Sequence, residues 1–357
     1  VEIREFDLQS AVFIEDGFFL PEAKGGATWI DENSLLVNTD FGEGSLTTSG
    51  YSRIVKHWDR GTPLEEAAVV FEGEVSDVSV GAWSMEATDN RYLVVSHSPS
   101  FFDRTLYLYQ DGELRRLEVP TDSRAYPFHE KLIVQLRSDW EVGDETYGSG
   151  SVIATNMADF MAGGREFEVI AEPTERITIR GSTPTQTHLI VATMEDVKGR
   201  LWRYTPTADG WTREQIDAPD FGSLGVSASD VHDDRFFFTY SSFIQPTTLY
   251  LSEADGTVSQ VRRMPEMFDS EGLTVSQEWA VSKDGTEVPY FLVHAEDLAT
   301  EGDNPTLLYA YGGFNVSMTP GYSATVGKTW LERGGVYAVA NIRGGGEYGP
   351  DLSLIHI

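Results

Sequence analysis

The chain contains no cysteine among its 357 residues. Disulfides, cysteine-ligated zinc or iron–sulfur centres and a cysteine nucleophile are therefore excluded. Its seven histidines include no HExxH pair, so the sequence gives no support for metal catalysis. No apolar run approaches the roughly 18 residues that a membrane-spanning helix requires. We accordingly expect no metal, no cofactor and no membrane partner.

Basic residues are also scarce. The 26 Lys and Arg residues stand against 57 Asp and Glu, which gives a formal net charge of −31, and only six of the 26 are lysine. A surface of this sign repels phosphate, so nucleic acids and anionic membranes are poor partners. Such a surface suits a salt-tolerant bacterium or an ordinary acidic protein. Hydrophobic residues make up 40% of the chain, which argues against intrinsic disorder.

The sequence begins Val-Glu-Ile-Arg, without Met and without a charged segment followed by an apolar one. It reads as if it began inside a domain, so the start of the chain does not indicate a compartment. We expect a cytoplasmic protein, with the periplasm as the alternative.

Short strands separated by turns are predicted over residues 1–265. Apolar runs rich in β-branched and aromatic residues recur, each followed by a second strand, and in several units by an Asp-Gly turn and a last strand. The recurring runs are Ser34–Val37, Tyr92–Ser96, Leu132–Leu136, Leu189–Thr193 and Phe236–Tyr240. A repeat of roughly 40–50 residues with about four strands is typical of a β-propeller. One irregular β-sandwich is the alternative, and the number of blades stays open.

A different pattern begins near Gly272. Lys283-Asp284-Gly285-Thr286 predicts a hairpin turn between two strands. The apolar run Leu307–Tyr311 predicts a strand buried on both faces, and Val336–Ile342 predicts a second one. Between them, Ser323–Arg333 has helical spacing and ends at Gly334-Gly335. Hairpin, strand, helix and strand are the opening of an α/β domain.

Two glycine-containing stretches follow the predicted buried strands. In the first, residues 309–314, Gly312-Gly313 allows a sharp turn with free N–H groups, and the Tyr311 hydroxyl is a candidate oxyanion donor. The alternative is a structural loop with a packed aromatic ring. The second, residues 341–349, has neither Walker A nor GxGxxG spacing, which favours a tight loop. No Gly-x-Ser-x-Gly motif occurs, so the sequence contains no nucleophile elbow.

These stretches resemble a known family. Residues 282–286 (SKDGT), 311–315 (YGGFN) and 340–349 (ANIRGGGEYG) resemble, in order and spacing, the start of the catalytic domain of the prolyl oligopeptidase family of bacterial type. Residues 240–246 (YSSFIQP) resemble the last-blade segment of that family. Residues 29–32 (WIDE) and 39–42 (TDFG) resemble the propeller of bacterial members. Together the similar stretches span nearly the whole chain.

The resemblance implies a mainly β protein with a β-propeller, here about five of seven blades, followed by the N-terminal part of an α/β-hydrolase domain. We expect the partial propeller over residues 1–268 and the incomplete catalytic domain over 269–357. The implied activity is serine-type hydrolysis of short peptides after proline. Tyr311 matches the oxyanion-hole tyrosine and Phe314 an apolar wall of the proline pocket. The Ser-Asp-His triad would lie beyond residue 357, and the chain would be truncated at both ends.

Two other functions remain open at this point. The first is a propeller that binds a partner without catalysis, because no nucleophile is present in the sequence. The second is an esterase or acylaminoacyl-peptidase activity on the same scaffold. Residues 351–357 do not match the family, and we interpret them as a truncated or misread end. The chain by itself is expected to be inactive.

Overall fold

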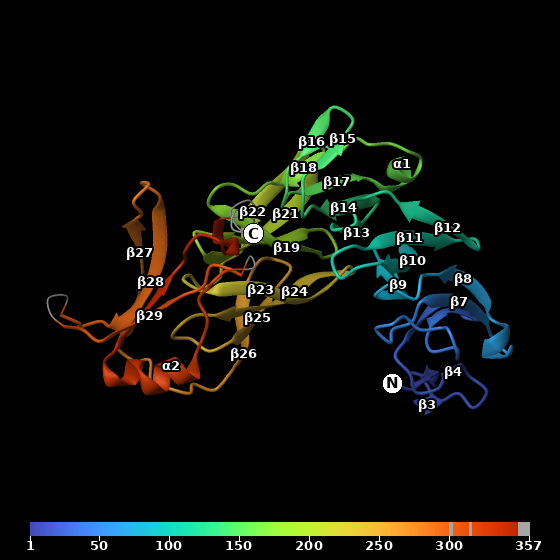
Figure 1. Cartoon of the computed structure of the whole chain (residues 1–357), viewed down its shortest axis with the longest axis horizontal. Coiled ribbons are helices and arrows are strands. Elements are labelled where there is room, and N and C mark those ends of the chain that lie inside the picture. The colour runs from blue at the N-terminus through green and yellow to red at the C-terminus, as the bar shows by residue number, and fades with distance from the viewer. Residues whose placement is uncertain (300–302, 314–315, 349–357) are drawn as a thin grey trace. The chain divides into compact units, whose positions relative to one another are not determined.

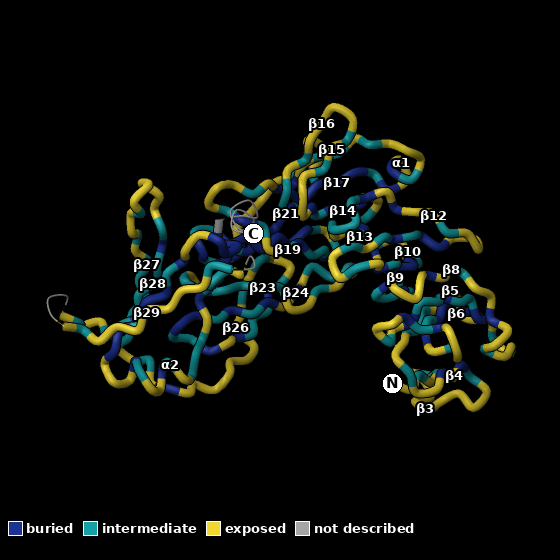
Figure 2. Tube along the Cα trace, in the orientation of Figure 1, coloured by how far each residue is buried: buried dark blue, intermediate teal, exposed yellow. Residues whose placement is uncertain are grey.

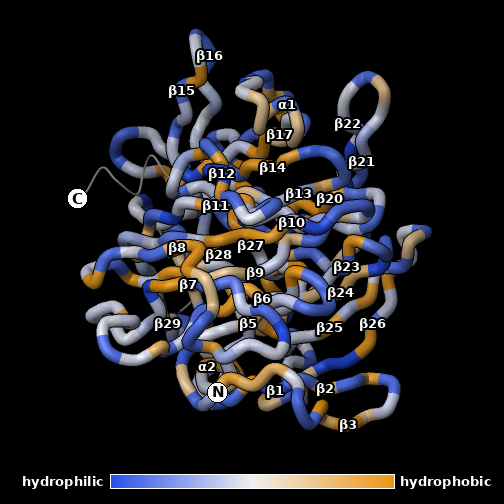
Figure 3. Tube along the Cα trace, turned by 90° about the vertical axis from the view of Figure 1, so that its right-hand side faces the viewer, coloured by the Kyte–Doolittle hydropathy of each residue, from blue (hydrophilic) through white to orange (hydrophobic). Residues whose placement is uncertain are grey.

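The computed structural model describes residues 1–299, 303–313 and 316–348, which form two compact units (Figure 1). The first unit consists of Val1–Ser138 and Thr155–Glu166, and the second of Asp139–Ala154 and Phe167–Ile357. Apolar residues occur in short stretches between polar ones (Figure 3). Within the described ranges, no helix is both long and apolar enough to cross a membrane.

The first unit is built from antiparallel strands. Two small pairs come first: β1 (Ile3–Arg4) with β4 (Phe19–Leu20), and β2 (Phe6–Asp7) with β3 (Val12–Phe13). Two four-stranded sheets follow, each with its strands paired in chain order. The first sheet contains β5 (Gly26–Asp31), β6 (Ser34–Asn38), β7 (Ile54–Asp59) and β8 (Ala68–Glu72), with the 3-10 helix η1 (Leu64–Glu66) before β8. The second contains β9 (Ser79–Glu86), β10 (Arg91–Ser98), β11 (Thr105–Gln110) and β12 (Glu113–Leu117).

The remaining elements up to residue 263 repeat the same antiparallel pattern. The first unit also holds the hairpin of β13 (Arg124–Phe128) and β14 (Lys131–Gln135), and helix α1 (Met157–Met161). In the second unit β15 (Trp140–Val142) pairs with β16 (Glu145–Tyr147). The first three residues of β17 (Val152–Asn156) also lie in this unit and pair with β18 (Glu168–Ala171). One four-stranded sheet contains β19 (Ile177–Pro184), β20 (Leu189–Glu195), β21 (Lys198–Thr207) and β22 (Gly210–Gln215). Another contains β23 (Ser223–Asp230), β24 (Asp233–Ser241), β25 (Thr248–Ser252) and β26 (Val258–Arg263).

The predicted strands of the repeat are confirmed. The five apolar runs form β6, β10, β14, β20 and β24. The middle residues of β6, β10, β14 and β20 are buried, as in Leu36 and Val94 (Figure 2). By contrast, β24 alternates, with Phe237 exposed between the buried Phe236 and Phe238. The expected turns are present at Asp111-Gly112 and at Gly256, where positive φ angles close the hairpins.

Consecutive sheets share apolar cores. Leu36 and Val55 of the first sheet pack with Val80, Val95 and Tyr109 of the second. In the second unit, Ile190 and Leu201 pack in the same way with Phe236 and Phe238 of the next sheet. In both of these pairs one sheet buries apolar side chains against the next, because a single sheet cannot cover its own apolar faces.

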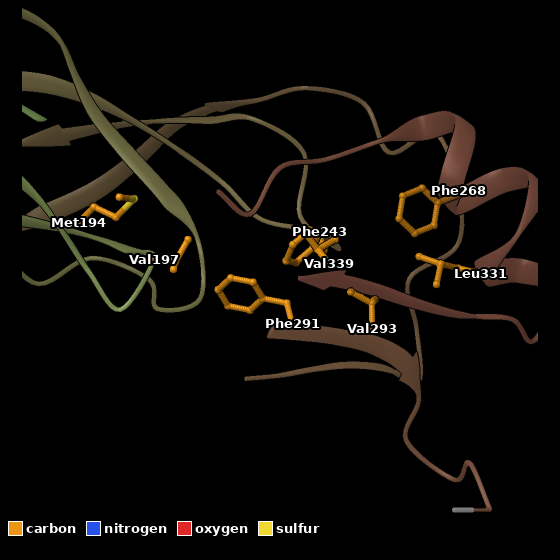
Figure 4. Packing of buried hydrophobic residues seen from close by; sticks show 8 residues of the cluster. All are labelled: Met194, Val197, Phe243, Phe268, Phe291, Val293, Leu331 and Val339. Atoms are coloured by element: carbon orange, nitrogen blue, oxygen red, sulfur yellow. The ribbon is translucent and has the colours of Figure 1, made fainter. Parts of the chain in front are cut away.

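The last sheet of the second unit contains both parallel and antiparallel strands. It has the order β27-β28-β30-β29, with β27 (Leu273–Val281), β28 (Glu287–Ala295), β29 (Thr306–Ala310) and β30 (Val336–Ala340). The β27–β28 hairpin turns at Gly285, as predicted. β29 and β30 are parallel, and the helix between them is confirmed. Its core contains Phe291 and Val293 of β28, Val339 of β30, and Leu331 and Phe268 (Figure 4).

Two expectations for this region are wrong. The predicted single helix over residues 323–333 is α2 (Ala324–Thr329) followed by the 3-10 helix η2 (Leu331–Arg333). The break lies at Trp330, whose indole N–H donates to the Val336 carbonyl at 2.8 Å. The strand predicted over Leu307–Tyr311 is not buried: Leu308 is 69% exposed, because β29 is the last strand of its sheet and only β30 borders it among the described residues. Gly334, with φ of 81°, ends η2 as expected.

Candidate active site

The candidate site consists of the two loops that follow β29 and β30. Because these strands are parallel and Ala310 lies opposite Ala340, both loops begin at the same edge of the sheet. The carboxyl edge of a parallel pair is where α/β proteins hold ligands. The first loop begins with Tyr311, Gly312 and Gly313, and the second runs from Asn341 into the short 3-10 helix η3 (Gly346–Tyr348).

The backbones of the two loops are in direct contact. A Cβ atom placed on Gly312 would lie 2.7 Å from the Arg343 carbonyl oxygen, and one on Gly344 would overlap the Gly312 carbonyl oxygen. Gly344 also has a φ of 99°, a conformation that side chains disfavour. Glycine is therefore required at both positions for the loops to approach each other this closely.

A buried carboxylate joins the same two loops. Glu347 is 2% exposed, and its Oε1 accepts hydrogen bonds from the Met318 backbone N–H at 2.7 Å and from Asn341 Nδ2 at 3.2 Å. Asn341 Nδ2 also donates to the Met318 carbonyl at 2.9 Å. Burial of a polar side chain costs free energy unless it is hydrogen-bonded, and these two donors satisfy Oε1. Glu347 and Asn341 thus clamp the chain on both sides of the candidate site.

The second loop is also tied to the β27–β28 hairpin. Arg343 Nη1 donates to Asp284 Oδ2, and Arg343 Nη2 donates to Ser282 Oγ. The hydrogen bond from Arg343 is the largest contribution that holds the pKa of Asp284 far below its usual range. Asp284 is therefore ionised at neutral pH, and this hairpin turn, the loop after β30 and the loop after β29 form one connected structure.

Tyr311 is the candidate oxyanion donor. Its side chain is 39% exposed, and its hydroxyl oxygen lies 3.5 Å from the position that a Cβ on Gly313 would take. The hydroxyl and the backbone N–H groups of Gly312 and Gly313 make no hydrogen bond to any residue in the described ranges. Three donors on one short loop are thus available to a ligand, and donors of this kind stabilise a developing oxyanion.

Comparison with known proteins decides the family. Residues 1–264 match the family model described as the prolyl oligopeptidase N-terminal β-propeller domain. The chain belongs to the prolyl oligopeptidase family. The similarity inferred from the sequence motifs is thereby confirmed, and the fold up to residue 264 is the propeller domain of this family.

Individual proteins also match the chain. An uncharacterized peptidase, y4nA, of Sinorhizobium fredii is 36% identical over 98% of this chain and 49% of its own length. A prolyl endopeptidase of Elizabethkingia miricola is 33% identical over 51% of this chain. The structure of a post-proline cleaving enzyme from Rickettsia typhi matches 98% of this chain and 53% of its own, with a TM-score of 0.81 and 28% identity. The chain spans about half the length of the curated relatives that match it over nearly its whole length.

Of the two site residues that the family resemblance implies, the structure describes only one. Tyr311 lies at the expected strand end, whereas Phe314 lies outside the described residues. In the sequence, Glu347 and Asn341 are only part of the motif at residues 340–349. The sequence does not predict that they hydrogen-bond to each other and to Met318. A glutamate after three glycines carries no sign of burial, so only the fold reveals this role. No group of three or more His, Asp or Glu side chains that could hold a metal ion is found in the described ranges.

Proposed function

We propose that this chain is the propeller region and the first part of the catalytic domain of a serine-type peptidase that hydrolyses short peptides after proline. Its family membership and its peptidase relatives support this proposal. The observation that carries it furthest is the pair of clamped loops at the carboxyl edge of β29 and β30. They present a tyrosine hydroxyl and two backbone N–H groups without a partner among the described residues.

The domain assignment is part of the same proposal. Residues 1–268 form the partial propeller, with about five of seven blades, and residues 269–357 begin the α/β-hydrolase domain. Tyr311 contributes the hydroxyl of the oxyanion hole, and Phe314 forms an apolar wall of the proline pocket. The serine, aspartate and histidine of the triad lie in the half of the protein that corresponds to the unmatched half of the relatives.

In this mechanism the serine Oγ attacks the peptide carbonyl carbon while histidine accepts the hydroxyl proton. The carbonyl oxygen becomes an oxyanion, and the Tyr311 hydroxyl donates a hydrogen bond to it. The C–N bond then breaks, and histidine returns the proton to the leaving amine. Water then attacks the carbonyl carbon of the acyl-enzyme while histidine accepts a proton from it. Histidine returns this proton to the serine Oγ as the ester bond breaks. Aspartate orients the histidine throughout.

The test compares the product of the complete gene with the 357-residue chain. Both are incubated with a fluorogenic peptide that carries proline before the scissile bond, with the alanine analogue, and with a serine-directed fluorophosphonate label. We expect proline-dependent turnover and labelling of the complete protein only, because the chain has no nucleophile elbow. Turnover by the chain alone would contradict the assignment of the triad.

The same experiment separates the other functions. A complete protein that is labelled but hydrolyses only simple esters or acylated amino-acid amides is an esterase or an acylaminoacyl-peptidase. A complete protein that is neither labelled nor active is a binding module built on a propeller. Either result would overturn the proposal of a proline-specific peptidase.

A further inference from the structure

We propose that a pocket between the first two sheets of the first unit binds the carboxylate group of a peptide. The pocket has a volume of about 350 Å³ and lies where β5 begins, β6 ends, and β9 and β10 pair. No acidic residue lines it, although acidic residues outnumber basic ones by more than two to one in the chain. This proposal rests on the proposed function, because it assumes that the ligands of the protein are peptides.

Two cations border the pocket, Lys24 and Arg104. Lys24 Nζ lies 4.5 Å from the centre of the Tyr51 ring, and the Arg104 guanidinium lies 5.9 Å from the centre of the Trp83 ring. Neither forms an ion pair with a carboxylate in the described ranges. An aromatic ring holds a cation in place without neutralising its charge. Both side chains therefore remain available to an anion.

The nearest acidic neighbour in the sequence does not compensate Arg104. Asp103 accepts hydrogen bonds from Ser100 Oγ at 2.7 Å and from Thr121 Oγ1 at 2.9 Å. These two hydroxyls account for the lowered pKa of Asp103 and occupy both of its oxygens. By contrast, Arg53 in the same unit pairs with Glu72 at 2.6 Å. Lys24 and Arg104 thus differ from Arg53 in having no carboxylate partner among the described residues.

The floor of the pocket consists of small hydroxyl-bearing residues on one face of the second sheet. Ser98 lies opposite Ser79, and Ser96 lies opposite Gly81, so these four residues share that face. Ser96 and Ser98 are 5% and 7% exposed. None of the three serine hydroxyls hydrogen-bonds to another described residue. These hydroxyls are therefore available to hydrogen-bond to a ligand in the pocket.

The walls are fixed before any ligand binds. Asn38 Oδ1 accepts a hydrogen bond from the Ala82 N–H at 3.3 Å. The other amide atom, Asn38 Nδ2, therefore points away from Ala82 and is a further donor at the pocket. The Val80 N–H donates to the Ser52 carbonyl at 2.8 Å. Hydrogen bonds between the two sheets therefore hold the donors in place, and a preorganised set of donors binds an anion at a lower entropic cost.

A carboxylate matches this arrangement. Lysine, arginine, amide and hydroxyl donors all hydrogen-bond to carboxylate oxygens, and charged partners make the stronger bonds. The rings of Tyr51 and Trp83 offer apolar surface to the rest of a peptide. The carboxylate can be the C-terminal group of a peptide or an aspartate or glutamate side chain. An overall charge of −31 repels such ligands, so a local cationic pocket is required to hold them.

The test is isothermal titration calorimetry on the 357-residue chain with three acetylated tripeptides. One ends in a free carboxylate, the second is its C-terminal amide, and the third is an amide with a central aspartate. We expect saturable binding of the first or third peptide, weaker at high salt, and none of the amide without a carboxylate. Which of the two binds identifies the source of the carboxylate. Binding of the amide alone, or of inorganic phosphate as tightly as either acid, would overturn the proposal.

Variants assign the binding to this pocket. Lys24→Gln and Arg104→Gln should each weaken binding about tenfold, because each removes one charged hydrogen bond. Lys24→Arg should retain binding. Lys56→Gln is the matched control, since Lys56 Nζ lies 4.6 Å from the Phe41 ring centre but does not line the pocket. Unchanged affinity in the double variant Lys24→Gln/Arg104→Gln would refute the site. Both pocket cations are exposed, so the melting temperature should not change.

The calorimetry requires no catalysis. A failure to bind carboxylates leaves the proposed peptidase activity untouched, and an inactive complete protein leaves a positive calorimetric result standing. The two proposals can therefore fail independently.

Discussion

Arg343 Nη1 donates to Asp284 Oδ2 and joins two segments that lie 59 positions apart in the chain. Asp284 lies in the turn between β27 and β28, and Arg343 lies in the loop after β30, whose carbonyl contacts Gly312. Both residues belong to stretches that resemble the prolyl oligopeptidase family. The ion pair therefore connects the loop that contacts Gly312 to the β27–β28 hairpin.

This pair predicts a specific dependence of stability on pH. The hydrogen bond from Arg343, with help from the Thr286 N–H, lowers the pKa of Asp284 in the folded state. Its contribution to stability is fully present above the unfolded pKa of about 4 and is lost as the pH falls through the lower folded value. Asp284→Asn should therefore lower the melting temperature most at neutral pH, with a difference that shrinks progressively below about pH 4.

Thermal unfolding of the chain across a pH series measures this difference. The control is Glu278→Gln, an exposed carboxyl on the same hairpin that makes no ion pair with a described residue. A gap between wild type and Asp284→Asn that stays constant down to strongly acidic pH would contradict the assignment.

Two glycines allow a matched test of the contact between the loops. Gly285 and Gly344 both have positive φ angles, of 86° and 99°, but only at Gly344 would an added methyl group have other atoms within 4 Å. Gly285→Ala should cost about 1–2 kcal/mol from backbone conformation alone. Gly344→Ala should cost a further ~1–3 kcal/mol, because the methyl group must displace the Gly312 carbonyl. Denaturant unfolding of both variants gives the comparison, and equal losses would show that the loops are not in contact.

In the four-stranded antiparallel sheets up to residue 263, the sequence predicts the second and later strands but not the first. β6 and β20 are continuous apolar runs, and their burial follows from that pattern. β9 and β23 were missed because they contain glycine, serine and alanine at several positions. These small residues give no alternating apolar pattern, and the strands form because a neighbouring strand supplies hydrogen-bond partners. Two of these small residues of β9, Ser79 and Gly81, form part of the proposed carboxylate pocket.

The sequence predicts where the candidate site lies, but not the contacts that hold its loops in place. Glycines after two apolar strands indicate loops at a sheet edge, and Tyr311 lies there. The exposure of β29 was not predictable, because an apolar run does not reveal whether a strand has one neighbour or two. The buried state of Glu347 was equally hidden, since it depends on Met318 and Asn341 from other segments.

Removal of the Glu347 clamp should weaken the fold around the site. In Glu347→Ala, the half-buried Met318 N–H loses its acceptor, which should cost about 1 kcal/mol or more. Glu347→Gln keeps an acceptor oxygen and should cost less. Glu287→Ala, at an exposed position on β28, is the control and should change stability little. Chemical denaturation measures all three, and a Glu347→Ala variant as stable as wild type would show that the clamp is unimportant.

Tyr311→Phe tests the oxyanion role in the complete protein. The substitution removes only the hydroxyl, which has no described protein partner, so the melting temperature should stay at the wild-type value. Loss of one oxyanion donor typically lowers kcat by about 10²–10³-fold, whereas KM should change little because the bond is strongest in the transition state. Tyr309→Phe is the matched control, since Tyr309 is 44% exposed on β29 and precedes the loop. Steady-state kinetics on a proline-containing peptide distinguish the roles. A tyrosine that only packs the loop predicts wild-type kcat for Tyr311→Phe and a loss of stability for Tyr311→Ala, and that result would remove Tyr311 from the mechanism.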